Sequence, residues 1–143
     1  MSQSSLPDDA VTPVLSLRQA MQAFVAERAW KRFHSPKNLA MSLAIEAAEV
    51  MEHVQWLDVE QSWKIAGDEQ SKAALGEELA DVFCYLLALT NVLNLDLTQI
   101  TLAKLEKNRN KYPVEAFRGR YGEKDPQPAL PPQHADLERE RRA

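Results

Sequence analysis

The chain has 143 residues, 45% of them hydrophobic, and a formal net charge of −4, which fits one domain and argues against binding to a nucleic acid polymer. A single cysteine, Cys84, excludes an intrachain disulfide and a multi-cysteine zinc site. The sequence shows neither a signal peptide nor an apolar run long enough for a transmembrane helix, so we expect a cytoplasmic protein with no membrane contact.

The apolar pattern predicts helices and no strand, so the expected fold class is all-α, a four-helix bundle over residues 15–117. Polar and Pro-rich stretches predict flexible tails at 1–14 and 118–143. We expect the first helix to begin at Ser16, because Ser16 and Gln19 have the spacing of a capping box.

Ser35 and Pro36 predict the start of the second helix, as N-cap and first helical residue, and its apolar stripe predicts that the helix runs to Leu57 or Val59. The following segment, 60–67, is expected to be a connection that turns a few apolar side chains inward.

Asp68 is the expected cap of the third helix, and Asn94 is a suitable end for it. Asp96 and Gln99 repeat the capping-box spacing, so the fourth helix is predicted to begin after Asp96 and to end before Pro113.

The second and third helices each carry two carboxylates three residues apart, Glu46 with Glu49 and Glu78 with Asp81. Positions i and i+3 are neighbours on one helix face, so each pair places like charges together. No lysine or arginine stands four residues from any of the four acids. A cation from elsewhere is one explanation, and solvated edges of amphipathic helices are the other.

A helical projection places the first acid of each pair at the border of the apolar stripe and the second one step closer to solvent. Helices packed through these stripes would direct all four carboxylates into one crevice, where hard oxygen ligands suit Mg²⁺ or Mn²⁺. A di-iron site would need Glu-x-x-His pairs, and His53 follows Glu49 one residue too late. Glu52, His53 and Glu77 are weaker candidates for a supporting role beside the acids.

The pattern Glu46-x-x-Glu49, then Glu78-x-x-Asp81 after 28 intervening residues, resembles the signature of the all-α nucleoside triphosphate pyrophosphohydrolases, the MazG-like superfamily. The resemblance is closest to the dCTP pyrophosphatase branch and covers about residues 16–115. Further matching residues are Trp30, His34, Gln55-Trp56, Tyr85, Lys104, Asn108-Arg109 and Lys111-Tyr112-Pro113.

The resemblance implies roles for most of the matching positions. Glu46, Glu49, Glu78 and Asp81 would hold Mg²⁺ (or Mn²⁺) against the triphosphate, with Glu49 or Glu46 as general base. The base and deoxyribose would be enclosed by Trp30, His34, Trp56 and Tyr85. Phosphate oxygens or the sugar would be contacted by Lys104, Asn108, Arg109, Lys111 and Tyr112.

The implied activity is hydrolysis of dCTP, or a modified deoxycytidine triphosphate, to the monophosphate and pyrophosphate, by a homodimer or homotetramer. Two alternatives remain: the same chemistry on another nucleotide such as dUTP, and a helical partner protein without catalytic activity. Some residues also have purely structural explanations. Trp30 can be a packing residue, and the basic residues near Lys111 favour a helix C-terminus in any case.

Overall fold

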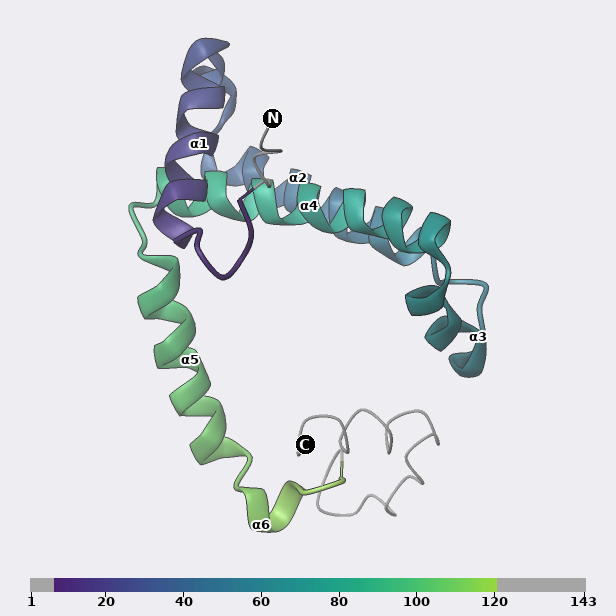
Figure 1. The fold of residues 1–143 in the computed structure, drawn as a ribbon. Helices are drawn as coiled ribbons and strands as arrows, with labels where there is room; N and C mark the ends of the chain where they lie inside the picture. The colour runs from purple at the N-terminus through teal and green to yellow at the C-terminus, as the bar shows by residue number, and fades with distance from the viewer. Residues whose placement is uncertain (1–6, 121–143) are drawn as a thin grey trace, which may run out of the picture. The chain divides into compact units, whose positions relative to one another are not determined.

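The computed structural model describes residues 7–120, and every regular element in that range is a helix (Figure 1). This confirms the expected all-α fold class. The predicted tails lie mostly outside the described residues. In chain order the elements are α1 (Val14–Glu27), the 3₁₀ helix η1 (Trp30–Phe33), α2 (Pro36–Glu52), α3 (Val59–Trp63), the 3₁₀ helix η2 (Lys64–Gly67), α4 (Glu69–Val92), α5 (Leu97–Lys111) and α6 (Val114–Phe117).

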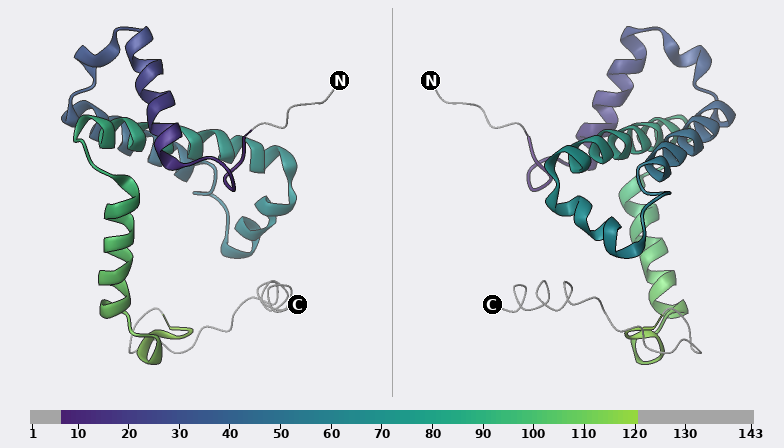
Figure 2. Two further views of the ribbon diagram at one scale, coloured as in Figure 1. Left: turned by 60° about the vertical axis from the view of Figure 1, so that its left-hand side comes forward. Right: turned by 90° about the vertical axis from the view of Figure 1, so that its right-hand side faces the viewer.

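The chain divides into two compact units, Met1–Ile100 and Thr101–Ala143. The first unit contains α1, α2 and α4, which are three of the four long helices that the sequence predicts. Within it, α2 and α4 pack side by side and α1 packs against one end of α4 (Figure 2). The second unit holds most of α5 together with α6.

Two predicted helix starts are confirmed by their capping hydrogen bonds. The N–H of Asn38 donates to Ser35 Oγ at 3.2 Å, and Pro36 takes the first helical position of α2. At the start of α4, the N–H of Ser71 donates to Asp68 Oδ2 at 2.9 Å. Each cap satisfies a backbone donor that has no partner inside its helix.

The junction between α4 and α5 also follows the sequence. Asn94 lies just after α4 with a φ of 51°, a left-handed conformation that asparagine tolerates better than most residues. Asp96 Oδ1 accepts a hydrogen bond from the N–H of Gln99 at 2.9 Å and so caps α5.

The predicted start of the first helix is wrong. α1 begins at Val14, directly after Pro13, and Ser16 is already inside the first turn because its N–H donates to the Pro13 carbonyl at 2.9 Å. Its side chain therefore does not serve as the N-cap, and the expected capping box with Gln19 does not form.

The predicted end of the second helix is also wrong, because α2 stops at Glu52. Asp58 and Gln61 form a capping box that starts a separate helix, α3, inside the segment expected to be a connection. Since that box needs extended backbone at Asp58, α2 cannot continue through it.

Val25, Leu39, Leu87 and Ala88 form the buried apolar core of the described residues. α1 is fixed to α4 by a reciprocal pair of hydrogen bonds, in which Arg18 Nε donates to Asn91 Oδ1 at 3.0 Å and Asn91 Nδ2 donates to the Arg18 carbonyl at 2.9 Å. Over residues 7–120, no helix taken singly has the length and apolar character to cross a membrane; only α4 and α5 taken together meet that criterion.

Candidate metal centre and adjacent cavity

Three of the four predicted carboxylates converge where α2 packs against α4. Oxygen atoms of Glu46, Glu49 and Glu78 all lie within 4.8 Å of one another. Glu46 and Glu49 come from consecutive turns of α2, and Glu78 faces them from α4. A donor set made only of carboxylate oxygens fits Mg²⁺ or Mn²⁺ better than a softer metal. Glu52 and Glu77 are exposed and do not join this group.

The carboxylates of this group lie close enough for their negative charges to repel one another. Desolvation raises the pKa of Glu46 above its usual value, and the neighbouring charges of Glu49, Asp81 and Glu78 raise it further. A cation placed among these carboxylates would favour the ionised form of Glu46.

Asp81, the fourth predicted acid, lies one turn along α4 from Glu78 and outside the group of three. It acts on Glu46 through its charge, and it also lines a cavity of about 450 Å³. Asp81 therefore connects the acidic group to the cavity.

This cavity, which we call the aromatic cavity, lies between α1, η1 and α4. Three of the four residues expected to enclose a base, Trp30, His34 and Tyr85, are brought together in its wall. The other lining residues are mostly apolar: Leu17, Ala20, Met21, Phe24, Ala80, Phe83, Cys84 and Leu87, with Asp81. Burial is the main cause that raises the pKa of the Cys84 thiol, so Cys84 acts here as a small apolar side chain.

The position of Trp30 in the aromatic cavity is set by its neighbours. Ala29, the residue before it, has a φ of 53°, so the chain turns sharply between α1 and η1. The Trp30 ring meets Phe24 edge to face, with ring centroids 5.9 Å apart. Trp30 nevertheless stays 43% exposed, so part of the indole surface is open.

His34 completes the wall and contributes a polar atom. Its ring lies 6.4 Å from that of Trp30, centroid to centroid. Its Nδ1 is buried and has no hydrogen-bond partner among residues 7–120. A buried polar atom without a partner costs free energy, so a ligand that bonds to this nitrogen gains affinity.

Trp56, the fourth predicted base-enclosing residue, is not in this cavity. It lies in the turn after α2 and is 87% exposed. The helix that was expected to carry Trp56 ends at Glu52, so Trp56 lies beyond α2.

The predicted phosphate-contacting residues lie in the second unit. Along α5, Lys104, Asn108 and Lys111 share one face, whereas Arg109 is turned away from Lys104 by roughly 140°. Arg109 Nη1 donates to Glu106 Oε2 at 2.9 Å. Tyr112 follows the helix and packs edge to face on Phe117.

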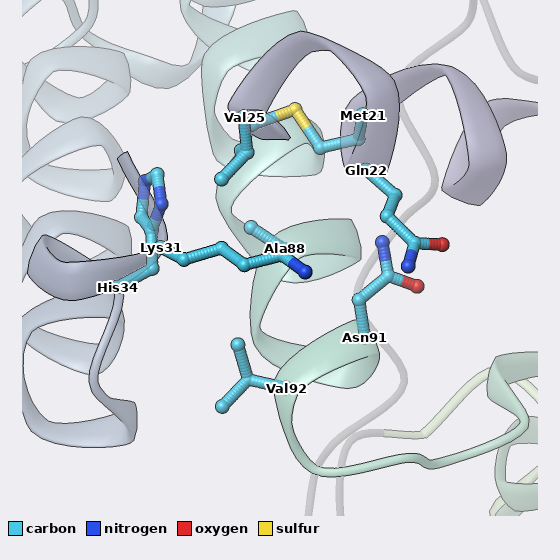
Figure 3. Close-up of a pocket in the computed structure, with 8 residues that line it drawn as sticks. All are labelled: Met21, Gln22, Val25, Lys31, His34, Ala88, Asn91 and Val92. Carbon is cyan, nitrogen blue, oxygen red and sulfur yellow. The ribbon is translucent and has the colours of Figure 1, made fainter. Parts of the chain in front are cut away.

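A second cavity, of about 350 Å³, was not predicted from the sequence (Figure 3). It shares His34 and Met21 with the aromatic cavity, and its polar lining comes from Gln22, Lys31 and Asn91. Figure 3 shows the Lys31 side chain extending across the cavity, and the amide groups of Gln22 and Asn91 pointing toward one another. The one feature of the sequence that could have pointed to this second cavity is the position of Lys31, directly after Trp30.

Comparison with known proteins places these features in context. The profile of a family described as MazG-like matches residues 41–123. The chain is similar to dCTP pyrophosphatase 1 of Bos taurus, with 41% identity over 103 residues, 72% of this chain and 61% of that protein. It is also similar to dCTP pyrophosphatase 1 of Homo sapiens, with 37% identity over 102 residues, 71% of this chain and 60% of that protein.

The chain thus spans about three fifths of the length of these curated relatives. Among solved structures, a pyrophosphatase from Archaeoglobus fulgidus DSM 4304 is 34% identical, with a TM-score of 0.66, and the match covers 76% of this chain and 99% of that one.

Proposed function

This chain belongs to the MazG-like family, and from that premise we propose that it is a Mg²⁺-dependent nucleoside triphosphate pyrophosphohydrolase. Its substrate is dCTP or a modified deoxycytidine triphosphate, and removal of that nucleotide cleans the nucleotide pool. The observation that carries the proposal is the convergence of Glu46, Glu49 and Glu78 beside the aromatic cavity. The names of the curated relatives support the choice of substrate.

The acidic group fits the metal that this reaction needs. Glu46, Glu49 and Glu78 hold Mg²⁺, with Asp81 contributing from the cavity side, and Mn²⁺ is a substitute with the same preference for oxygen. When bound, the metal neutralises phosphate charge and acidifies a water molecule. A triphosphate cannot approach four carboxylates without such a cation, because both partners are negatively charged.

The side chains of this protein divide the remaining work. A carboxylate of the group, Glu49 or Glu46, accepts the proton of the water that attacks the α-phosphorus. Trp30 and Tyr85 enclose the base, and the free Nδ1 of His34 meets its polar edge. We assign contacts with the phosphates and the sugar to residues of α5 and the turn after it, from the family resemblance: Lys104, Asn108, Arg109, Lys111 and Tyr112.

The proposal is tested by measuring pyrophosphate release from a panel of nucleotides with and without Mg²⁺. We expect Mg²⁺-dependent release that is fastest with dCTP or its modified forms. If dUTP is turned over faster than dCTP, dUTP is the substrate in place of dCTP. If purine nucleotides are turned over as fast as dCTP, the site is not specific for pyrimidines. No release from any nucleotide would favour a non-catalytic helical partner.

We further propose that the protein works as a homodimer or homotetramer. Large apolar side chains stay exposed on the single chain, among them Met41 at 56% and Ile45 at 55% on one face of α2. Leu79 and Phe83 form a similar pair on α4. A second copy of the chain is the partner that would cover such faces, since isolated monomers rarely expose large apolar patches.

Ile45→Glu is expected to convert the oligomer to a monomer, because burying a glutamate in an apolar interface costs several kcal/mol. Sedimentation at micromolar concentration measures the change. Gln70→Glu adds the same charge at an exposed, polar position in the first turn of α4 and should leave the mass unchanged. A wild-type protein that sediments as a monomer would contradict the proposed assembly.

A further inference from the structure

The imidazole of His53 lies beside the acidic group, and the proposed reaction gives it no role. His53 is the C-cap residue of α2, and its Nε2 lies 3.8 Å from Glu78 Oε1 on α4. Both side chains are partly sheltered, with exposed fractions of 33% for His53 and 23% for Glu78. The contact crosses from α2 to α4 at the point where the carboxylates converge.

Glu78 needs such a contact more than the other acids do. It is the one member of the group of three that comes from α4, and it faces two carboxylates on α2. Repulsion from Glu46 and Glu49 opposes this close approach of the Glu78 carboxylate. A donor on Glu78 can offset that repulsion and hold one carboxylate oxygen, leaving the other for a metal.

The geometry fits a donor of this kind. A separation of 3.8 Å is longer than a hydrogen bond, and a small rotation of the imidazole or of the carboxylate closes it. The helix ends at His53, so this side chain leaves α2 at its last turn and beside α4. Glu52, its neighbour in sequence, is exposed and outside the acidic group.

We propose that His53 is a positioning residue that holds the Glu78 carboxylate in the orientation that binds the metal. The inference rests on the proposed function, since it assumes that the three carboxylates hold Mg²⁺ or Mn²⁺. Partners of metal ligands commonly set metal affinity in this way, and their loss weakens binding about 10- to 100-fold.

The test measures Mn²⁺ affinity directly, by isothermal titration calorimetry on the full chain without nucleotide. His53→Leu keeps side-chain bulk but removes the donor, and we expect about tenfold weaker Mn²⁺ binding. His53→Gln keeps an N–H donor and is expected to restore most of the affinity. Gln70→Leu makes a similar polar-to-apolar change at an exposed position in the first turn of α4, outside the acidic group, and should bind Mn²⁺ like the wild type.

The outcomes separate the two proposals. Wild-type protein that binds no Mn²⁺ and releases no pyrophosphate contradicts the proposed function itself. If the wild type does both and His53→Leu binds Mn²⁺ equally well, only the positioning role is wrong. Equal losses in His53→Leu and His53→Gln also overturn it, because a donor would then not be the relevant property. His53→Ser, which is too short to reach Glu78, replaces the leucine variant if that one does not fold, with the same expected loss and the same overturning result.

Discussion

Pyrophosphate release from dCTP is expected to fall at least about a hundredfold when Glu78 is replaced by glutamine. The change keeps the shape of the side chain and removes the charge that α4 contributes to the group of three carboxylates. A hundredfold loss corresponds to roughly 3 kcal/mol of transition-state stabilisation, within what a correctly held metal ion supplies. The rate at saturating dCTP and Mg²⁺ is the measurement.

The adjacent residue provides the matched control for this experiment. Glu77→Gln makes the same chemical change one position earlier on α4, where the side chain is exposed and lies outside the acidic group. It should keep the wild-type rate. Both variants should unfold at temperatures close to that of the wild type. Glu78→Gln removes one of several repelling charges, and Glu77→Gln changes an exposed side chain. A fully active Glu78→Gln enzyme would refute the metal assignment.

Trp30→Ala is expected to raise the KM for dCTP about ten- to hundredfold. The indole lines the aromatic cavity next to Tyr85 and His34, and stacking of a base on an aromatic ring contributes about 1–3 kcal/mol. Initial rates over a range of dCTP concentrations measure the effect. The turnover number should change less than KM, because the acidic group is untouched.

Phe33→Ala is the control for the tryptophan variant. Phe33 belongs to the same short helix, η1, but its ring is exposed, stacks with Arg32 and lines neither cavity. Its loss should leave the KM for dCTP within about twofold of the wild-type value. If the two variants raised KM equally, general disturbance of η1 would explain the result and Trp30 would not be a base platform.

The features that the sequence predicted correctly are those set by local chemistry. Ser35 and Asp68 cap their helices because each needs only a backbone N–H three residues ahead. The convergence of Glu46 and Glu78 follows from a shared apolar stripe, since two helices that pack through matching stripes bring the same borders together.

The features that were missed depend on competition between neighbouring segments or on packing in three dimensions. The apolar stripe of α2 continues past Glu52, and nothing in that stripe shows that the capping box at Asp58 will end the helix. For the same reason Trp56, expected near the end of that helix, lies in the turn after it. The second cavity combines polar side chains of α1, η1 and α4 that have no common spacing in the sequence.

The left-handed turn at Ala29 has a consequence for how the proposed nucleotide substrate would be received. Alanine in this conformation costs about 1–2 kcal/mol, and the chain accepts that cost at the residue directly before Trp30. The turn is made during folding, when the contact with Phe24 fixes the indole. Under the proposed function, the entropy of ordering this ring is therefore lost before substrate arrives and does not reduce the affinity for the base.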